Sequence, residues 1–274
     1  MRLSFLYLRV IFFLAISSFF LVVFKLNERK GKLVSPNGLL EFYNSLINSE
    51  YKIYSQNGED GVIEKLIETI NLNKTHGYYV EFGVQDGQEC NTRYLRVKFE
   101  WTGLLMDGLY RNPSINLHKE NIHFNNILSL FEKYKVPIEI DVLSEDTDYA
   151  DYYIIEKILT KYRPKILVHE VNQQPADMCV TVPREDDIIL WDGTDFHGGS
   201  VCAFWCLAKR FSYTMVYCEK NGVNCFWIRN DLFEKHLGID HKEAQKILDP
   251  KFLYQKQQFT HSSKNESNWV HVIC

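Results

Sequence analysis

The residues best suited to chemistry in this sequence are acids and glycines that follow an apolar, strand-like run. In the segment GYYVEFGVQDGQECNT, Glu81 closes the run and Gly83, Asp86 and Gly87 follow it. Glycine allows a sharp turn and lets a ligand approach the backbone without a Cβ in the way. Asp107 ends the next apolar run, at the spacing of roughly 20 residues at which an acid binds a ribose diol. The segment therefore predicts a nucleoside-binding loop.

Two further apolar runs also end in chemically active side chains. DVLSEDTD carries Asp146 and Asp148, and KILVHEVN carries His169 and Glu170. The carboxyl ends of parallel strands meet at one edge of a sheet, where ligands bind, so these acids are expected around one pocket. The glycine loop departs from GxGxxG, and a rim of carboxylates would repel a pyrophosphate. S-adenosylmethionine fits better, because it carries a sulfonium, an ammonium and a ribose diol and has no phosphate.

Transfer of a methyl group to oxygen needs an aligned hydroxyl and a base within hydrogen-bond reach. Asp146, His169 and Glu170 are the candidate catalytic residues. Neighbours on a strand point to opposite faces, so only one of His169 and Glu170 can face the pocket. For His169 a core or rim position is favoured, and for Asp146 and Asp148 helix capping is the alternative. A ligand for Glu81 is favoured, because a buried acid without a partner is costly.

The loop WDGTDFHGGS carries Asp192, Asp195 and His197. A substrate lid or a divalent-metal site is one interpretation of this loop. An irregular loop that ends at a helix cap, Ser200, is favoured, and no set of metal ligands is predicted.

The elements that must position these residues alternate between helix and strand. Near-continuous apolar strands separated by amphipathic helices indicate a mainly parallel sheet that is covered on both faces. A short strand is expected at 122–124, in the least regular region, and a hairpin around Asn221-Gly222, the strongest short hairpin signal. Strands are expected within 78–83, 101–108, 138–148 and 165–172, and helices within 55–73, 90–99, 127–134, 152–162 and 198–211.

The chain has seven cysteines, so at least one is free or paired outside the chain. Cys202 and Cys206 lie one turn apart on an expected helix, which favours core packing over a bridge. A two-residue turn at Asn221-Gly222 would place Cys218 opposite Cys225. Two reduced cysteines are favoured there, with a disulfide as the alternative.

The N-terminal sequence predicts a membrane segment. Residues 1–26 are expected to form an uncleaved signal-anchor, favoured over a cleaved signal peptide because the apolar run continues past the possible cleavage site. Basic residues after the span favour a cytosolic body. Two glycosylation sequons, at Asn73 and Asn265, favour the lumen. We expect a linker and short helix at 27–50, the main domain at 51–232 and a C-terminal extension at 233–274.

Composition excludes several functions. The 274 residues carry a net charge of −4, so no basic surface indicates nucleic-acid binding. The sequence contains no GxxxxGK[ST], HExxH or CxxC motif, which leaves no signature of a phosphate-binding P-loop or a zinc site.

Five stretches in this order resemble the FkbM-like methyltransferase superfamily: SQNGEDGVIEKL, YYVEFGVQDGQECNTRYL, WTGLLMDG, DVLSEDTDYADYYIIEKIL and GVNCFWIRND. They are most similar to its eukaryotic membrane-anchored branch, which includes Star-type proteins of the secretory pathway. The resemblance spans roughly residues 52 to 232. It implies a class I methyltransferase (Rossmann-like) fold, with a mainly parallel seven-stranded sheet and an antiparallel C-terminal hairpin.

The resemblance also implies roles for individual residues. It assigns S-adenosylmethionine binding to Glu81, Gly83, Asp86, Gly87 and Asp107, and an acidic segment after the fourth strand to Asp146 and Asp148. Glu170 falls at the end of the fifth strand. Tyr149-Ala150 replaces the glycine usual after the second acid, which leaves the substrate side open.

Two functions remain open. One is an S-adenosylmethionine-dependent methyltransferase that acts on a hydroxyl of a small molecule or glycan. The other is an inactive protein of the same fold that serves secretory trafficking or binds protein cargo. In either case we expect a single-pass membrane protein of the endoplasmic reticulum or Golgi with a lumenal C-terminal domain.

Overall fold

The computed structural model describes residues 36–174, 177–256, 261–263 and 268–274. The predicted membrane segment at 1–26 and the sequon at Asn265 lie outside these residues. No helix in the described ranges is both long enough and apolar enough to cross a membrane.

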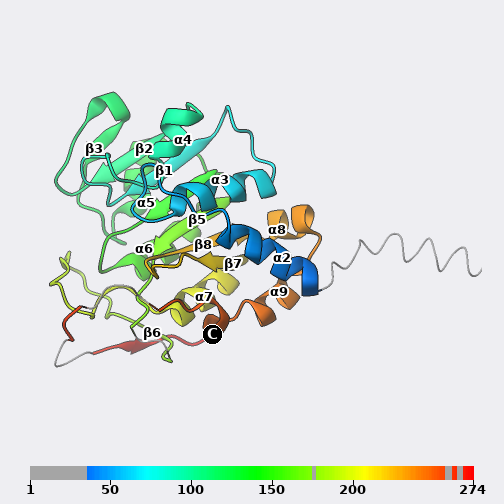
Figure 1. The fold of residues 1–274 in the computed structure, drawn as a ribbon. Coiled ribbons are helices and arrows are strands. Elements are labelled where there is room, and N and C mark those ends of the chain that lie inside the picture. The colour runs from blue at the N-terminus through cyan, green and yellow to red at the C-terminus, as the bar shows by residue number, and fades with distance from the viewer. Residues whose placement is uncertain (1–35, 175–176, 257–260, 264–267) are drawn as a thin grey trace, which may run out of the picture.

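A seven-stranded sheet forms the centre of the molecule, in the strand order β3-β2-β1-β4-β5-β8-β7 (Figure 1). All neighbouring strands run parallel except β8, which is antiparallel to both β5 and β7. This is the expected Rossmann-like methyltransferase fold, a mainly parallel sheet that ends in an antiparallel hairpin. The strands are β1 (Tyr78–Phe82), β2 (Thr102–Asp107), β3 (Leu117–Lys119), β4 (Val142–Glu145), β5 (Ile166–Glu170), β7 (Tyr213–Cys218) and β8 (Asn224–Arg229).

The helices up to α7 fall in the expected segments, and those after β8 were not predicted. Those that connect or precede the strands are α2 (Pro36–Ile47), α3 (Glu59–Thr69), α4 (Arg93–Lys98), α5 (Ile127–Lys133), α6 (Asp151–Leu159) and α7 (Val201–Arg210). Three more follow β8: α8 (Asn230–Leu237), α9 (His241–Ile247) and α10 (Pro250–Leu253). The expected cap of α7 is confirmed, because the Ser200 hydroxyl accepts a hydrogen bond from the Ala203 N–H.

The third strand is not where the sequence predicted it. The apolar tripeptide 122–124 is not a strand, and β3 lies instead just after the short 3-10 helix η1 (Pro113–Ile115). Leu117 is fully buried and pairs with Leu105 of β2. Pairing with β2 therefore determines where the third strand lies, and the local apolar pattern is not sufficient to predict it.

Helices cover both faces of the sheet. On one face, Tyr43 of α2 packs edge-on against Tyr217 of β7, which stacks with Phe226 of β8. The next residue of β8, Trp227, points to the other face and packs near Phe204 of α7. Helices α5, α6 and α7 pack in sequence on this second face, and α2 packs with α3 on the first.

The sequence was wrong about most of the cysteines. Disulfides join Cys179 to Cys202, Cys206 to Cys274, and Cys218 to Cys225. Cys202 and Cys206 do share a helix, but each bridges to a distant segment instead of packing in the core, because the fold brings Cys179 and Cys274 against α7. Cys218 lies opposite Cys225, as predicted. The two form a disulfide, so the favoured reduced state was wrong. Cys90 is buried and free, so the expected odd cysteine is confirmed.

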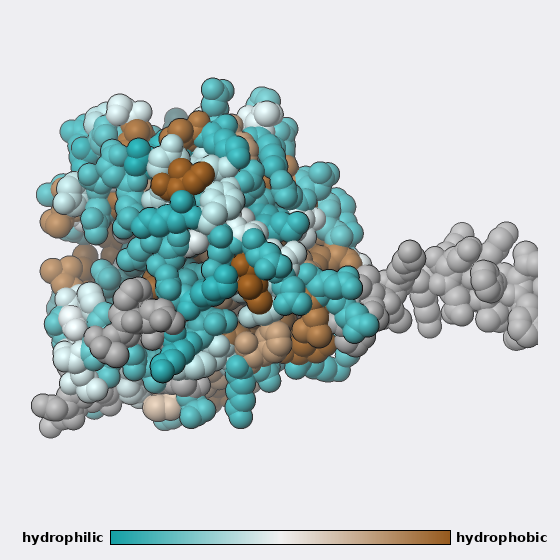
Figure 2. Space-filling view, in the orientation of Figure 1, coloured by the Kyte–Doolittle hydropathy of each residue, from teal (hydrophilic) through white to brown (hydrophobic). Residues whose placement is uncertain are grey.

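The chain beyond residue 232 continues the same core. Phe233, Ala244, Leu248 and Leu253 are fully buried in the main hydrophobic cluster. Near the C-terminus, β9 (Val270–His271) pairs antiparallel with β6 (Val180–Thr181) at the edge of the molecule (Figure 1). The face seen in Figure 2 is mostly hydrophilic, with hydrophobic residues in separate patches.

Candidate functional site

The glycines after β1 are required by the chain itself. Gly83 and Gly87 have φ angles of +77° and +76°, which favour glycine. A Cβ on Gly83 would collide with the backbone carbonyl of Asp146, and one on Gly87 would crowd Ile115. The close approach that the sequence attributed to a ligand is therefore made, at Gly83, by the loop after β4.

Glu81 holds the loop that leads into α4. Its carboxylate accepts hydrogen bonds from the backbone N–H groups of Asn91 and Thr92 at 2.7 and 2.8 Å, and from the Thr92 hydroxyl at 2.6 Å. Burial raises the pKa of Glu81, and the hydrogen bonds from Thr92 and Asn91 oppose that rise. Because the chain satisfies this acid, its burial does not require a ligand, and that part of the sequence argument was wrong.

Asp107, at the end of β2, orders two loops around a cavity. One carboxylate oxygen accepts the Gln85 N–H at 2.7 Å, and the other accepts the Leu109 and Tyr110 N–H groups at 2.7 and 3.1 Å. Oδ2 thus has one protein donor and retains capacity to accept another hydrogen bond. This arrangement suits a hydroxyl donor from a ligand.

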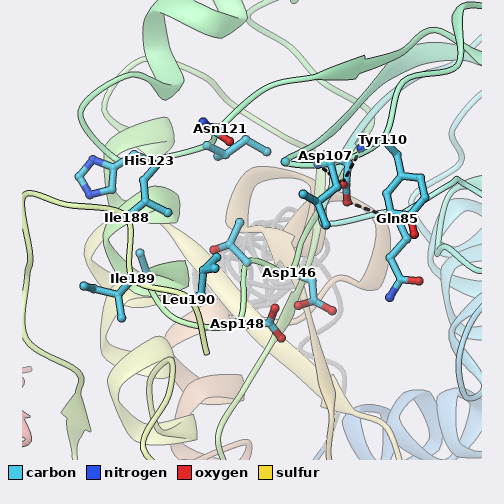
Figure 3. A pocket seen from close by; sticks show the side chains of 16 residues that line it. Gln85, Asp107, Tyr110, Asn121, His123, Asp146, Asp148, Ile188, Ile189 and Leu190 are labelled. Carbon is cyan, nitrogen blue, oxygen red and sulfur yellow. Dashed lines mark hydrogen bonds between the residues drawn. The ribbon is translucent and has the colours of Figure 1, made fainter. Parts of the chain in front are cut away.

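A cavity of about 340 Å³ opens at the carboxyl ends of β1, β2 and β4, and we call it the β2 cavity. Asp107 and Asp146 both line it, together with Gly83 (Figure 3). Apolar side chains from two separate loops face the same space, including Leu109 and Ile122. Its size and mixed lining are those of a small-molecule site.

A second cavity of about 290 Å³ adjoins the first, and we call it the acidic cavity. Both are lined by Gln85, Asp146 and Asp148, and Glu170 faces the acidic cavity only. A smaller space of about 100 Å³ lies beside Glu81 and also shares Gln85 and Asp146. The acids predicted at separate strand ends therefore converge, with Asp146 at the junction of all three spaces.

The acids of this junction raise one another's pKa values. Burial and the neighbouring Asp148 raise the pKa of Asp146 well above its ordinary value. Burial and then Asp146 do the same for Glu170. Burial, aided by the charge of Asp151, raises the pKa of Asp148 to about 6. A cation would stabilise this arrangement, because it would offset the mutual repulsion.

Beneath the site lies a second pair of buried acids. Glu145 and Asp151 are 1% and 0% exposed, and the Thr147 hydroxyl donates to both, at 2.9 and 3.2 Å. Asp151 also accepts the Thr147 N–H at 2.8 Å, so it orders the turn that carries Asp146 and Asp148. Asp148 sits in that turn with a φ of +65°, a conformation that Asp tolerates better than most residues.

Three predicted site residues line none of the three cavities: His169, Asp86 and Gly87. His169 is fully buried against Phe204 and Trp227, and burial lowers its pKa to about 3. Its neighbour Glu170 faces the acidic cavity, so the expected alternation of faces is confirmed and His169 is not a candidate base. Asp86 is exposed and accepts the Gln88 N–H at 2.9 Å, closing its own turn.

Sequence reasoning missed the residues that loops bring to the site. Gln85 lines all three spaces and has a φ of +49°, a strain that no composition rule indicates. Ile188, Ile189 and Leu190 border the β2 cavity from the segment before the WDGTDFHGGS loop (Figure 3). The sequence does show three consecutive apolar residues next to a loop. The structure leaves all three exposed, which is unusual for such a run.

Comparisons with known proteins give only distant structural likeness. No protein-family profile matches the chain, and no curated protein matches it. Solved structures similar to it include a METTL16 methyltransferase domain, 12% identical over 61% of this chain with a TM-score of 0.36. This chain covers 65% of that domain.

Two others are M. capricolum TrmK with S-adenosyl-homocysteine, and an S-adenosylmethionine-dependent methyltransferase from Aquifex aeolicus. The first is 11% identical over 65% of this chain and 75% of its own, with a TM-score of 0.32. The second is 9% identical over 62% of this chain and 91% of its own, with a TM-score of 0.35.

Proposed function

We propose that this chain is an S-adenosylmethionine-dependent methyltransferase of the FkbM-like type that acts on a hydroxyl of a small molecule or glycan. The observation that carries the proposal is the β2 cavity, which joins a ribose-type acid, Asp107, to the acidic junction at Asp146. Fold alone would not suffice, because one fold hosts many functions. The strand order and the sequence resemblance support the same conclusion.

The residues present fit this cofactor. Asp107 would accept hydrogen bonds from the ribose hydroxyls through the free capacity of Oδ2, and Leu109 with Ile122 would contact the adenine. The acid at the junction, Asp146, would face the cationic end of the molecule. No lysine or arginine of the described residues lines the β2 cavity, which disfavours a phosphate-bearing nucleotide.

The acceptor hydroxyl would occupy the acidic cavity. When bound, the cofactor supplies an electrophilic methyl group. Asp146 and Glu170 border the cavity, and either would accept the hydroxyl proton when ionised, since a raised pKa makes the ionised group a stronger base than an ordinary carboxylate. Trp191 and His261 border the same space and would contact the acceptor.

The binding half of the proposal is tested by calorimetry on the purified full-length chain in detergent. We expect heat of binding with S-adenosylmethionine and with S-adenosylhomocysteine, and Asp107→Asn should weaken both at least about ten-fold, the loss of one good hydrogen bond. Asp86→Asn is the matched control, because Asp86 lies outside all three cavities, and it should bind as the wild type does. Thermal unfolding without ligand checks that both variants are folded.

Turnover is tested with labelled S-adenosylmethionine and a panel of hydroxyl-bearing small molecules and glycans. If the wild-type chain gives neither heat nor a thermal shift with either nucleoside, the methyltransferase proposal falls. The alternative, an inactive protein that binds cargo in secretory trafficking, would then be favoured.

We also propose a lumenal location for the folded part, behind a single membrane span. Three disulfides among the described cysteines support an oxidising compartment. Asn73 is exposed, as a glycosylated asparagine must be. The test is sensitivity of the expressed chain to an endoglycosidase.

A further inference from the structure

The acidic cavity is lined by three carboxylic acids and by no lysine or arginine of the described residues. Carboxylate oxygens of Asp146, Asp148 and Glu170 all lie within 4.8 Å of one another. The charged groups with the largest effect on these three carboxyls are other acids. Three such groups held together without a compensating cation repel one another and destabilise the fold.

Two buried polar atoms at this cluster have no hydrogen-bond partner among the described residues. Glu170 Oε2 is buried and accepts no hydrogen bond among the described residues. His197 is 3% exposed, and its Nε2 has no hydrogen-bond partner within the described ranges either. His197 Nδ1 lies 3.8 Å from Glu170 Oε2, and both side chains line the acidic cavity. Unpaired buried polar groups of this kind are costly, and a ligand bound in the acidic cavity would remove that cost.

We propose that Asp146, Asp148 and Glu170 bind a divalent cation such as Mg²⁺, Mn²⁺ or Ca²⁺. Carboxylate oxygens suit these hard cations, which take oxygen ligands at about 2.0–2.6 Å. Oxygens up to about 4 to 5 Å apart can therefore contact one ion. The site joins the loop after β4 to the end of β5, and the sequence predicted no metal there.

His197 completes the surroundings of the cation. It comes from the WDGTDFHGGS loop, which the sequence allowed as a metal site but did not favour. Its Nδ1 lies 3.8 Å from Glu170 Oε2, close enough that a small movement would let the imidazole hydrogen-bond and orient this carboxylate, as groups behind metal ligands commonly do. His197 is therefore a positioning residue.

The role of the cation rests on the proposed function. Its place beside the β2 cavity would let it hold an oxygen of the acceptor and lower the pKa of that hydroxyl. Asp146 and Glu170 would then act through the cation instead of as proton acceptors. Binding of the cation itself does not depend on methyl transfer.

The test uses the full-length chain, freed of metal with a chelator and kept without S-adenosylmethionine. Titration with Mn²⁺, followed through the electron paramagnetic resonance signal of the free ion, should show one ion bound per chain. Glu170→Gln should bind Mn²⁺ at least about ten-fold more weakly, a loss typical of a changed metal site. Glu132→Gln, an exposed glutamate paired with Lys161, should bind Mn²⁺ as the wild type does.

Folding and binding are separated by a second measurement. In chelator, Glu170→Gln should unfold at the same or a higher temperature than wild type, because one like charge is removed. Mn²⁺ should raise the unfolding temperature of the wild type and not that of the variant. His197→Gln should weaken Mn²⁺ binding and be milder than Glu170→Gln.

Three outcomes decide between the two proposals. If the wild-type chain leaves free Mn²⁺ unchanged at millimolar concentration, or Glu170→Gln binds as tightly as wild type, the metal site is wrong. If S-adenosylmethionine binds and Mn²⁺ does not, the cofactor supplies the positive charge and only the proposed function stands. If Mn²⁺ binds and S-adenosylmethionine does not, the metal site stands and the methyltransferase proposal falls.

Discussion

Replacing Glu81 by glutamine tests whether this acid holds the chain or a ligand. In the structure its two oxygens accept three hydrogen bonds, two from backbone N–H groups and one from the Thr92 hydroxyl. Glutamine keeps one oxygen and turns an N–H donor toward a backbone N–H. The change loses at least one hydrogen bond to a charged group, about 1.5 to 3 kcal/mol, and leaves a buried donor unpaired, about 1 to 3 kcal/mol.

Burial of a charged carboxylate is unfavourable and raises the pKa of Glu81. Glutamine has no charge, so removing this cost offsets part of the loss. We therefore expect a net destabilisation of about 3 kcal/mol, which lowers the unfolding temperature by about 6 to 12 °C in a domain of this size. Thr92→Val removes only the hydroxyl donor and should cost about half as much. The two changes should be less than additive when combined, because both act on one carboxylate.

The assay is urea unfolding of the full-length chain, with S-adenosylmethionine binding measured in parallel. Glu132→Gln, an exposed glutamate paired with Lys161 and outside the three spaces, is the control and should be neutral. A Glu81→Gln chain that is as stable as wild type and has lost only nucleoside binding would refute the structural role of Glu81. A ligand-binding role would then take its place.

Four further predictions follow from the same contacts. Gly83→Ala should destabilise the chain by more than about 2 kcal/mol in urea unfolding, since it combines a positive φ with a backbone collision. Replacing Cys206 and Cys274 together by serine should cost about 4 kcal/mol, because the disulfide closes a 68-residue separation; an unchanged midpoint would contradict the bridge. Hydrogen bonds from Lys133 and Tyr134 lower the pKa of Glu120, so its stabilisation is present above the unfolded pKa and lost as the pH falls through the folded one. Glu120→Gln should thus unfold at a lower temperature than wild type at pH 7 and converge with it in acid; a constant difference would refute this. Asn73→Gln should abolish an endoglycosidase-sensitive gel shift if Asn73 carries a glycan.

The sequence predicted what depends on local pattern. Strands β1, β2, β4 and β5 are apolar runs that parallel pairing buries on both faces, so their type and place follow from composition. The Cys218–Cys225 register follows from the glycine turn, where Gly222 takes a φ of +74°. The convergence of Asp107, Asp146 and Glu170 follows from one rule, that parallel strands end at one edge.

What the sequence could not predict depends on contacts between distant segments. Cys274 lies beside Cys206 in a fold where the C-terminal strand pairs with β6, far from it in sequence. Nothing near Glu81 indicates that Asn91 and Thr92 will turn their N–H groups toward it. The buried position of His169 depends on α7, which covers that face of the sheet. In each case the deciding partner is supplied by the fold, and residue type alone misleads.

The contact between Gly83 and Asp146 determines how the two cavities relate. The loop after β1 can approach the loop after β4 only because residue 83 lacks a Cβ, and the atom it approaches is the carbonyl of Asp146 itself. The side chain of Asp146 borders both the β2 cavity and the acidic cavity. A shift of this backbone would therefore move an acid that serves both spaces at once. For that reason, substitutions at Gly83 should alter nucleoside and Mn²⁺ binding together, whereas substitutions at Asp107 or Glu170 should separate them.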